Sequence, residues 1–244
     1  MDIYYDLKIL IKKLAYLNSI FNFASQSTFK MSNTEEQLAA LKDIQKMMER
    51  SSRFLSLNGL SGIFVGLTAL AGAFVAYLFI GSMEGNLPYF EYAKNADGQM
   101  NLSFLAFFLI DALGVLFISL FIATWLTIRK ARRQGEKVWT ASGRRLMFNM
   151  AIPLISGGLF CMIMVLHGYS GMVAPATLVF YGLALMNASK YTYEHVKFLG
   201  LVEIALGLLA GIFINNGLLF WALGFGVAHM LYGVIAYFTF EKRN

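Results

Sequence analysis

From residue 57 onward the chain alternates long apolar blocks with short polar segments. A helix of about 20 apolar residues crosses the ~30 Å hydrocarbon layer of a membrane, where an unpaired backbone group finds no partner. Each block therefore predicts a transmembrane helix. The fourth block is the shortest and has Pro175 in its first turn, a position that tolerates proline. The six predicted spans are residues 57–80, 102–128, 146–167, 172–188, 197–214 and 218–240.

Residues 31–56, before the first span, have the pattern of an amphipathic cytoplasmic helix. Thr34 and Gln37 stand at the spacing of a capping box, and Leu38 and Leu41 begin an apolar stripe on one face. We expect this helix to lie along the lipid or the helical bundle, or to bind a partner through its apolar face.

Residues 1–30 combine a further apolar stripe with several lysines. The pattern predicts either a basic amphipathic segment at the membrane surface or an over-extended gene start, since Met31 is a natural first residue. The expected organisation is thus a basic N-terminal segment, the amphipathic helix of residues 31–56 and a six-helix transmembrane domain over residues 57–244.

Composition supports an all-α, polytopic membrane bundle. Of the 244 residues, 58% are hydrophobic and 14% are charged, against about 25% charged residues in a typical soluble domain. Cys161 is the single cysteine, which excludes an intramolecular disulfide and a cysteine-based zinc cluster. The fold is therefore expected to depend on helix packing.

The distribution of positive charge predicts the orientation. All lysines and arginines except Lys94 fall on one side of the six predicted spans, and the positive-inside rule makes that side cytoplasmic. The segment 81–101 has Glu84, Glu91 and Asp97 against Lys94, as expected for an exported loop. Both termini are then cytoplasmic, in the cytoplasmic membrane of the cell.

A basic cytoplasmic loop is predicted between the second and third spans. The positive-inside rule is sufficient to account for the charge of this loop. The same charge also suits contact with anionic lipid headgroups or with an acidic protein partner. The net charge of +6 does not indicate nucleic-acid binding, because no motif or basic domain accompanies it. A homo-oligomer is left open. The basic residues of the loop are Arg129, Lys130, Arg132, Arg133, Lys137, Arg144 and Arg145.

The candidate intramembrane site is a polar pair, Glu203 and His229. Each residue lies on a stripe of small residues, which marks a helix face that packs closely on protein. The short connection at residues 215–217 predicts an antiparallel hairpin, in which the two residues are 13 positions on either side of Asn216 and so at the same depth. The pair either fixes the register of the hairpin or forms part of a proton or cation path.

Asp111 is the only other acidic residue within a predicted span, and we consider it as a further relay group. His167, His195 and His229 are predicted at different depths, so we expect neither a shared metal site nor a bis-histidine haem. No nucleophile, phosphate loop or cofactor motif is recognisable. The sequence therefore predicts a protein that is not an enzyme and has no cofactor.

The chain from residue 31 onward resembles a family of six-span bacterial inner-membrane proteins for which no activity is known. Three stretches show the resemblance, at residues 49–62, 174–192 and 217–229. The resemblance implies six spans and a location in the bacterial inner membrane, and it implies nothing about mechanism.

Two functions are compatible with the sequence. The first is a non-enzymatic membrane protein that docks a soluble partner or senses the bilayer through the helix at residues 31–56 and the basic loop. The second is a small proton- or cation-linked transporter that uses Glu203 and His229. The membrane and its lipids are the partners expected in either case.

Overall fold

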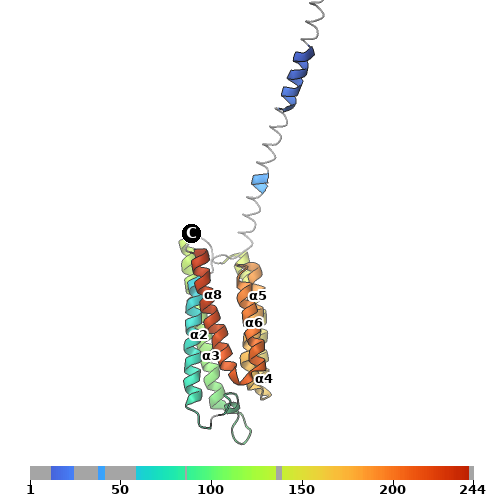
Figure 1. Ribbon diagram of the computed structural model, residues 1–244. Coiled ribbons are helices and arrows are strands. Elements are labelled where there is room, and N and C mark those ends of the chain that lie inside the picture. Colours follow the sequence, from blue (N-terminus) through green and yellow to red (C-terminus); the bar gives the residue numbers. More distant parts are fainter. Residues whose placement is uncertain (1–11, 25–37, 42–58, 86, 136–138, 242–244) are drawn as a thin grey trace, which may run out of the picture. The chain divides into compact units, whose positions relative to one another are not determined.

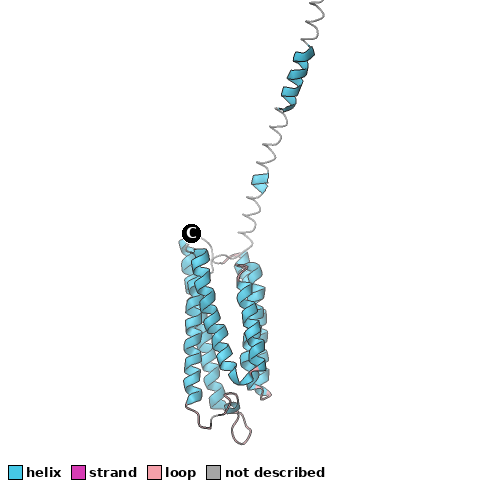
Figure 2. Ribbon diagram, viewed as in Figure 1, coloured by secondary structure: helices cyan, strands magenta, loops and turns pink. Residues whose placement is uncertain are grey.

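The computed structural model describes residues 12–24, 38–41, 59–85, 87–135 and 139–241. Its regular elements there are helices (Figure 2), with one isolated bridge between Lys94 and Met100. The chain divides into two compact units, Met1–Ser51 and Ser52–Asn244. In the first unit, residues 12–24 and 38–41 are helical and exposed. The remainder of the amphipathic helix predicted at residues 31–56 lies outside the described residues.

The second unit contains long helices, with a longer connection at residues 82–101 between α2 and α3 (Figure 1). Three-residue 3-10 turns are η1 (Glu91–Ala93), η2 (Ser170–Met172), η3 (Ser189–Tyr191) and η4 (Ile214–Asn216), and π-helical segments are η5 (Ala222–Ala228) and η6 (Tyr237–Glu241). The α-helices are α2 (Gly59–Gly81), α3 (Leu102–Arg133), α4 (Ala141–Leu166), α5 (Val173–Ala188), α6 (Val196–Ile212), α7 (Gly217–Trp221) and α8 (His229–Ala236).

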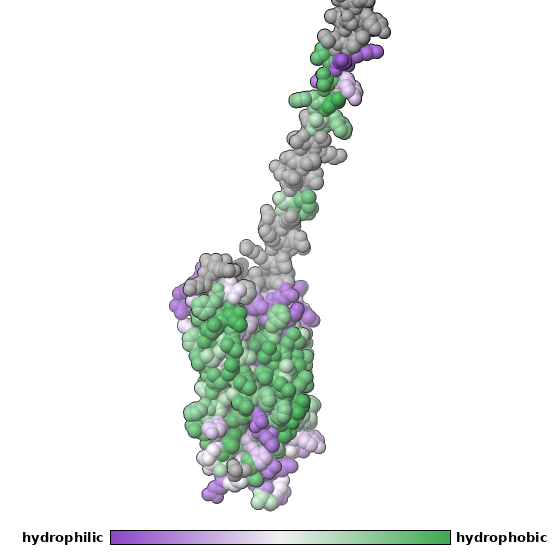
Figure 3. All heavy atoms as spheres, in the orientation of Figure 1, coloured by the Kyte–Doolittle hydropathy of each residue, from purple (hydrophilic) through white to green (hydrophobic). Residues whose placement is uncertain are grey.

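Five helical segments in the described part of the chain are long and apolar enough to cross a membrane: Gly59–Gly81, Leu102–Arg133, Ala141–Leu166, Ser170–Tyr191 and Ile214–Thr239. Large apolar side chains on their outer faces are exposed, including Ile110 and Phe117 of α3. Figure 3 shows apolar side chains over the middle of the bundle and polar ones gathered at its two ends. The chain is therefore a multi-helix membrane protein, because soluble proteins rarely expose so large an apolar surface to water.

The fifth predicted span corresponds to α6, which has 17 residues and is shorter than the five membrane-length segments. It ends at Ile212, because Phe213 leaves the helical region with φ −102° and ψ 60°. Six spans are thus not shown, although α6 would still extend about 26 Å at the rise of an α-helix. The sixth predicted span is also less regular than expected, since η5 interrupts it between α7 and α8.

The predicted basic loop at residues 129–145 is largely helical, which corrects the expectation of a loop. Lys130, Arg132 and Arg133 form the last turn of α3, where cations favour the negative end of the helix dipole. Helix α4 begins at Ala141, and the Thr140 side chain accepts a hydrogen bond from the Gly143 amide at 3.1 Å, as an N-cap does.

The helices of the second unit form two groups, one of α2, α3 and α8 and one of α4, α5 and α6 (Figure 1). Glycines hold the first group together. An ideal Cβ built on Gly62 would lie 3.0 Å from the Gly233 Cα, and one built on Gly66 would lie 2.5 Å from the Gly226 carbonyl oxygen. Backbone therefore meets backbone between α2 and the η5–α8 helix, as small-residue motifs allow.

Glycines also hold the second group together. An ideal Cβ on Gly182 of α5 would lie 2.6 Å from the Gly200 carbonyl oxygen of α6, and one on Gly207 would lie 2.9 Å from the Val179 amide nitrogen. The glycine stripe of α6 thus faces α5, and that of α8 faces α2. Both stripes pack closely on protein, as predicted, but on helices of their own group and not on each other.

The segment between α2 and α3 links the two groups at one end. The Tyr89 hydroxyl donates to the Gly171 carbonyl oxygen at 3.4 Å, and it fills the space beside Gly217. Burial raises the pKa of Tyr89 to about 12, so it remains a hydrogen-bond donor at neutral pH. In the same segment, Tyr92 packs on Phe104 at the start of α3.

Candidate functional site: a buried carboxyl group beside a cavity

Glu203 lies seven residues into α6, about 10 Å from the beginning of that helix. Its exposed fraction is 0%, which makes it one of the largest fully buried side chains in the described part of the protein. The carboxyl group extends toward the other helix group and lies against η5, where an ideal Cβ on Gly224 would be 2.5 Å from Oε2. Only glycine leaves room for the carboxyl group at that position.

His229 meets Glu203 across the two groups of helices. It is the first residue of α8, directly after η5, and its Nδ1 lies 3.2 Å from the Glu203 Oε1. The predicted pair is therefore in contact. The structure reaches this contact without direct packing of the two glycine stripes, because α7 and η5 cross beside α6 before α8 continues along α2.

The hydrogen bonds of His229 define its tautomer. Nδ1 lies 3.1 Å from the Gly224 carbonyl oxygen, which can only accept, so Nδ1 has the hydrogen. In the neutral imidazole, Nε2 then accepts a hydrogen bond from the Tyr181 hydroxyl at 2.9 Å. Tyr181 comes from α5, so both contacts of His229 with α5 and α6 connect the two helix groups.

Glu203 is less well satisfied than its neighbour. Neither of its carboxyl oxygens has a hydrogen-bond partner among the described residues, although Nδ1 of His229 is close. The reason is that the single Nδ1–H is aligned with Gly224 and not with the carboxyl group. A buried polar group without a hydrogen bond costs about 1–3 kcal/mol, and such exceptions require an explanation.

A cavity of about 200 Å³ lies beside this pair, between the two helix groups. Its wall comes from the first half of α2 and of α4, Ala123 of α3, the second half of α5, the turn before α6 with the start of that helix, and α8. The cavity is therefore at the end of the bundle opposite Tyr89. Most of its lining is apolar, and its polar side chains are Ser61, Tyr181, Tyr193, His195, His229 and Tyr232.

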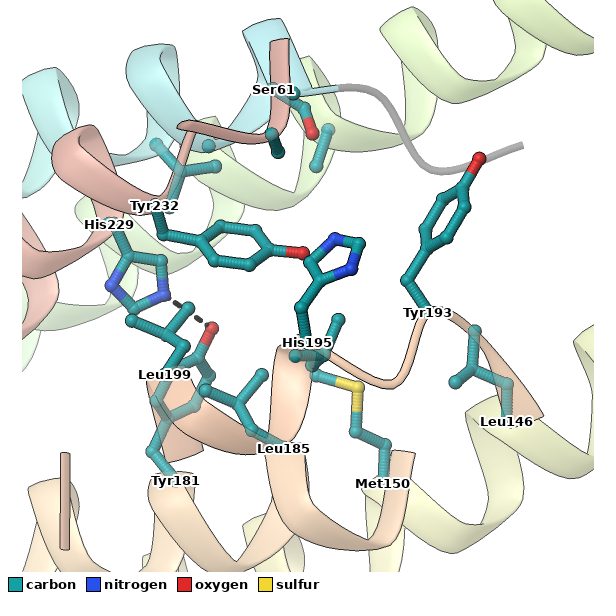
Figure 4. A pocket seen from close by; sticks show the side chains of 16 residues that line it. Ser61, Leu146, Met150, Tyr181, Leu185, Tyr193, His195, Leu199, His229 and Tyr232 are labelled. Atoms are coloured by element: carbon teal, nitrogen blue, oxygen red, sulfur yellow. Dashed lines mark hydrogen bonds between the residues drawn. The ribbon is translucent and has the colours of Figure 1, made fainter. Parts of the chain in front are cut away.

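His195 and Tyr232 belong to this site and were not recognised from the sequence. Figure 4 shows the Tyr232 ring between His229 and His195, with Tyr181 hydrogen-bonded to His229. The ring centroids of His195 and Tyr232 are 5.6 Å apart. Burial lowers the pKa of His195 from its ordinary value of 6.5. Counting depth along separate helices placed His195 and His229 apart, but both line one cavity.

Asp111, the proposed relay group, lies elsewhere. It is half-buried on α3 and faces α2, where its carboxyl oxygens are 3.5 and 3.6 Å from an ideal Cβ on Gly72. It does not line the cavity, and α3 and α6 belong to different helix groups. A three-membered ladder of Asp111, His229 and Glu203 therefore has no support in this geometry.

The basic residues predicted for lipid contact are on the surface at the ends of α3 and α4. Arg132, Arg133, Arg144 and Arg145 are exposed, and Arg129 stacks over the Trp125 ring at 5.5 Å. Lys137 lies outside the described residues. No cluster of three or more histidine, cysteine, aspartate or glutamate side chains suited to a metal occurs in the described part of the chain.

Comparisons of the chain with protein-family models, with curated proteins and with solved structures found no match. The resemblance to six-span inner-membrane proteins therefore stays a prediction. What is shown is a multi-helix protein with five apolar helices of membrane length.

Proposed function

We propose that this protein is a small, non-enzymatic permease that couples the movement of a solute to a proton held by Glu203 and His229. The observation that supports it best is the Glu203 carboxyl group, which is fully buried, has no hydrogen-bond partner among the described residues and touches a histidine that lines a cavity. Ionisable groups inside a membrane are costly, so they are retained mainly where they work.

The two ring nitrogens of His229 suit proton transfer. Nε2 is on the cavity side, through Tyr181, and Nδ1 is on the side of Glu203. An imidazole that accepts a proton at Nε2 and releases the one at Nδ1 moves a proton between the two sides without a large displacement. Glu203 is the acceptor within reach, provided that the Nδ1–H turns from Gly224 toward the carboxyl group.

The surrounding fold has features expected of a transporter. The ionisable pair lies where two helix groups meet, and one of its members follows a π-helical interruption, which in membrane proteins often marks a functional site. The cavity lies between the groups at one end, while the Tyr89 segment connects them at the other end.

The proposal includes six spans, with α6 as the fifth, and cytoplasmic termini in a bacterial inner membrane. It rests on the positive charge that flanks one end of the helices. A reporter fused after Asn244 should then act as cytoplasmic, and one inserted at Asn95 as exported. An exported C-terminal reporter would require an odd number of spans or the opposite orientation.

Proton movement can be measured with the purified chain in liposomes that contain a pH-sensitive dye. The driving force is a potassium diffusion potential or, separately, an added small solute of each charge class. We expect wild-type vesicles to take up protons and Glu203→Gln vesicles to take up none above the protein-free rate, because the amide cannot exchange a proton.

The matched control is Glu194→Gln, the same change at an exposed glutamate whose ion pair with Lys197 is 3.6 Å long. This variant should behave as wild type. The permease proposal fails if wild-type and Glu203→Gln vesicles give the same proton uptake under both driving forces, with both proteins folded by their unfolding temperatures.

Partner docking or bilayer sensing stays a prediction. The helix at residues 31–56 that supports it lies mainly outside the described residues, and the exposed arginines of α3 and α4 suit anionic headgroups as well as a soluble partner.

A further inference from the structure

Aromatic rings from three different parts of the chain surround the cavity. Tyr181 comes from α5, Tyr193 and His195 from the turn before α6, and His229 with Tyr232 from α8. Ring centroids are 5.1 Å apart for Tyr193 and His195, and 5.3 Å apart for Tyr181 and His229. Rings so arranged around a hollow offer the negative faces that attract a cation.

The electrostatic surroundings also favour a cation. No lysine, arginine, aspartate or glutamate is among the described residues that line the cavity. Burial lowers the pKa of His195 below 6.5, which keeps this ring neutral at neutral pH. The carboxyl group of Glu203 lies directly behind His229, and any negative charge on it would add to the attraction.

The size of the cavity limits the ligand. Its volume of about 200 Å³ is below the roughly 300–1,000 Å³ of pockets for drug-sized molecules. Apart from Ser61 and the glycines, apolar side chains make up the rest of the wall, which suits methyl or methylene groups better than a hydrated metal ion. The ligand that matches is a small organic ion whose charge is covered by carbon.

We propose that the cavity binds a small organic cation, an amine or quaternary ammonium compound, on the rings of Tyr181, Tyr193 and Tyr232. The inference rests on the proposed function in one respect: the bound cation would be the solute that moves in exchange for the proton of Glu203. Binding itself does not depend on transport, so the two can fail separately.

The test compares three probes of one shape on the purified full chain in detergent, by isothermal titration calorimetry. They are choline, its uncharged carbon analogue dimethylbutanol, and the anion tert-butylacetate. We expect choline to bind about 5- to 30-fold more tightly than the uncharged analogue, as a cation–π contribution predicts. The anion should bind most weakly.

Variants at Tyr232 test the contribution of the ring. Tyr232→Phe keeps the aromatic face and should leave choline affinity within about 3-fold of wild type, whereas Tyr232→Leu should lower it about 5- to 30-fold. The affinity for the uncharged analogue should change little in either variant. Unfolding temperatures would establish that both variants are folded, and Tyr193→Phe with Tyr193→Leu gives an independent second pair.

Equal affinity for choline and the uncharged analogue would overturn the cation site, as would the absence of choline binding to the wild-type protein. Equal choline affinity of the Phe and Leu variants at both positions would also overturn it. Choline binding that depends on Tyr232, without proton uptake by wild-type vesicles, would keep the site and overturn the permease. Proton uptake that requires Glu203, without tighter binding of choline than of the uncharged analogue, would keep the permease and overturn the cation site.

Discussion

The contacts within each helix group and the contacts between the two groups are built differently. Within a group, glycines such as Gly62 and Gly233 bring backbones into direct contact, and a hydrogen bond of 2.6 Å between the Thr68 and Ser119 hydroxyls joins α2 to α3. Between the groups, Glu203, His229 and Tyr181 meet beside a cavity. Close apolar packing is rigid, because any displacement costs many dispersion contacts at once. An interface that contains a cavity and only a few polar contacts can change its conformation at a lower cost in free energy.

This difference indicates two rigid helix groups with an adaptable contact between them. We call this contact, formed by Glu203, His229 and Tyr181 beside the cavity, the seam. Interfaces that are bistable respond to a local change in charge by changing as a whole. Under the proposed function, the transfer of a proton within the Glu203–His229 pair would be such a change, and both residues lie in the seam. Substitutions within a group should therefore affect stability alone, and substitutions in the seam should affect both stability and the binding of protons or ligand.

The largest effect is expected from Gly233→Leu, in the rigid α2–α8 contact. An ideal Cβ at Gly233 would lie 2.5 Å from the Ile63 amide nitrogen and 2.7 Å from the Gly59 carbonyl oxygen, so backbone atoms must move. We expect a loss above about 4 kcal/mol, or no folded protein. The unfolding temperature in detergent would measure it.

Gly158→Leu is the matched control, since an ideal Cβ at this glycine of α4 has no neighbour within 4 Å. It should change stability by less than about 0.5 kcal/mol. Similar losses of stability for the two variants would mean that the α2–α8 contact is not packed more tightly than the lipid-facing surface. The distinction between rigid helix groups and an adaptable contact between them would then fail.

The next effect concerns the seam itself. His229→Leu leaves the Glu203 carboxyl group buried without its neighbour and should cost about 1–3 kcal/mol. Glu203→Gln keeps the shape and removes the ionisable group, so it should cost less. The double variant with leucine at both positions should recover much of the loss, because both polar groups are gone.

A double-mutant cycle on unfolding temperatures, with both single leucine variants, would report the coupling. Additive losses would show that the two side chains do not interact energetically, in spite of their 3.2 Å contact.

The smallest effect is a pH dependence from His195. Its pKa is lowered in the folded state because burial disfavours the charged ring, so the unfolded chain binds the proton more readily. Stability should therefore be highest above pH 6.5 and should fall as the pH decreases through that value toward the lowered pKa. The Tyr193 and Tyr232 rings pack against this ring in the described part of the chain.

Unfolding temperatures of wild type and His195→Gln between pH 8 and pH 5 would test this. We expect the difference between the two proteins to change in favour of the variant as the pH falls. A constant difference would mean that His195 titrates equally in the folded and unfolded chain, and that the cavity does not shield it.

Much of the helical organisation could be predicted from the chain alone. Helix α3 begins at Leu102, where Asn101 caps it through the Phe104 amide, and α5 covers residues close to those expected. The pairing of Glu203 with His229 was also predicted, by counting from the turn at Asn216. Counting did not reveal that the neighbouring glycines of α6 and α8 face α5 and α2. Tyr181, Tyr232 and His195 could not be found in this way, since nothing in their local sequence distinguishes them from interfacial aromatic residues.

The sequence by itself determined that the protein is helical, that it suits a membrane and where its apolar segments begin and end. The physical reason is that hydrocarbon requires every backbone group to be paired within its own segment, so length and apolar composition suffice. Only the tertiary structure decided which helix each glycine stripe faces, that Glu203 has no hydrogen bond to any of the described residues, and where the cavity lies. In a membrane helix nearly every face is apolar, so hydrophobicity cannot select the neighbour. That selection depends on the fit of side chains from segments far apart in the chain.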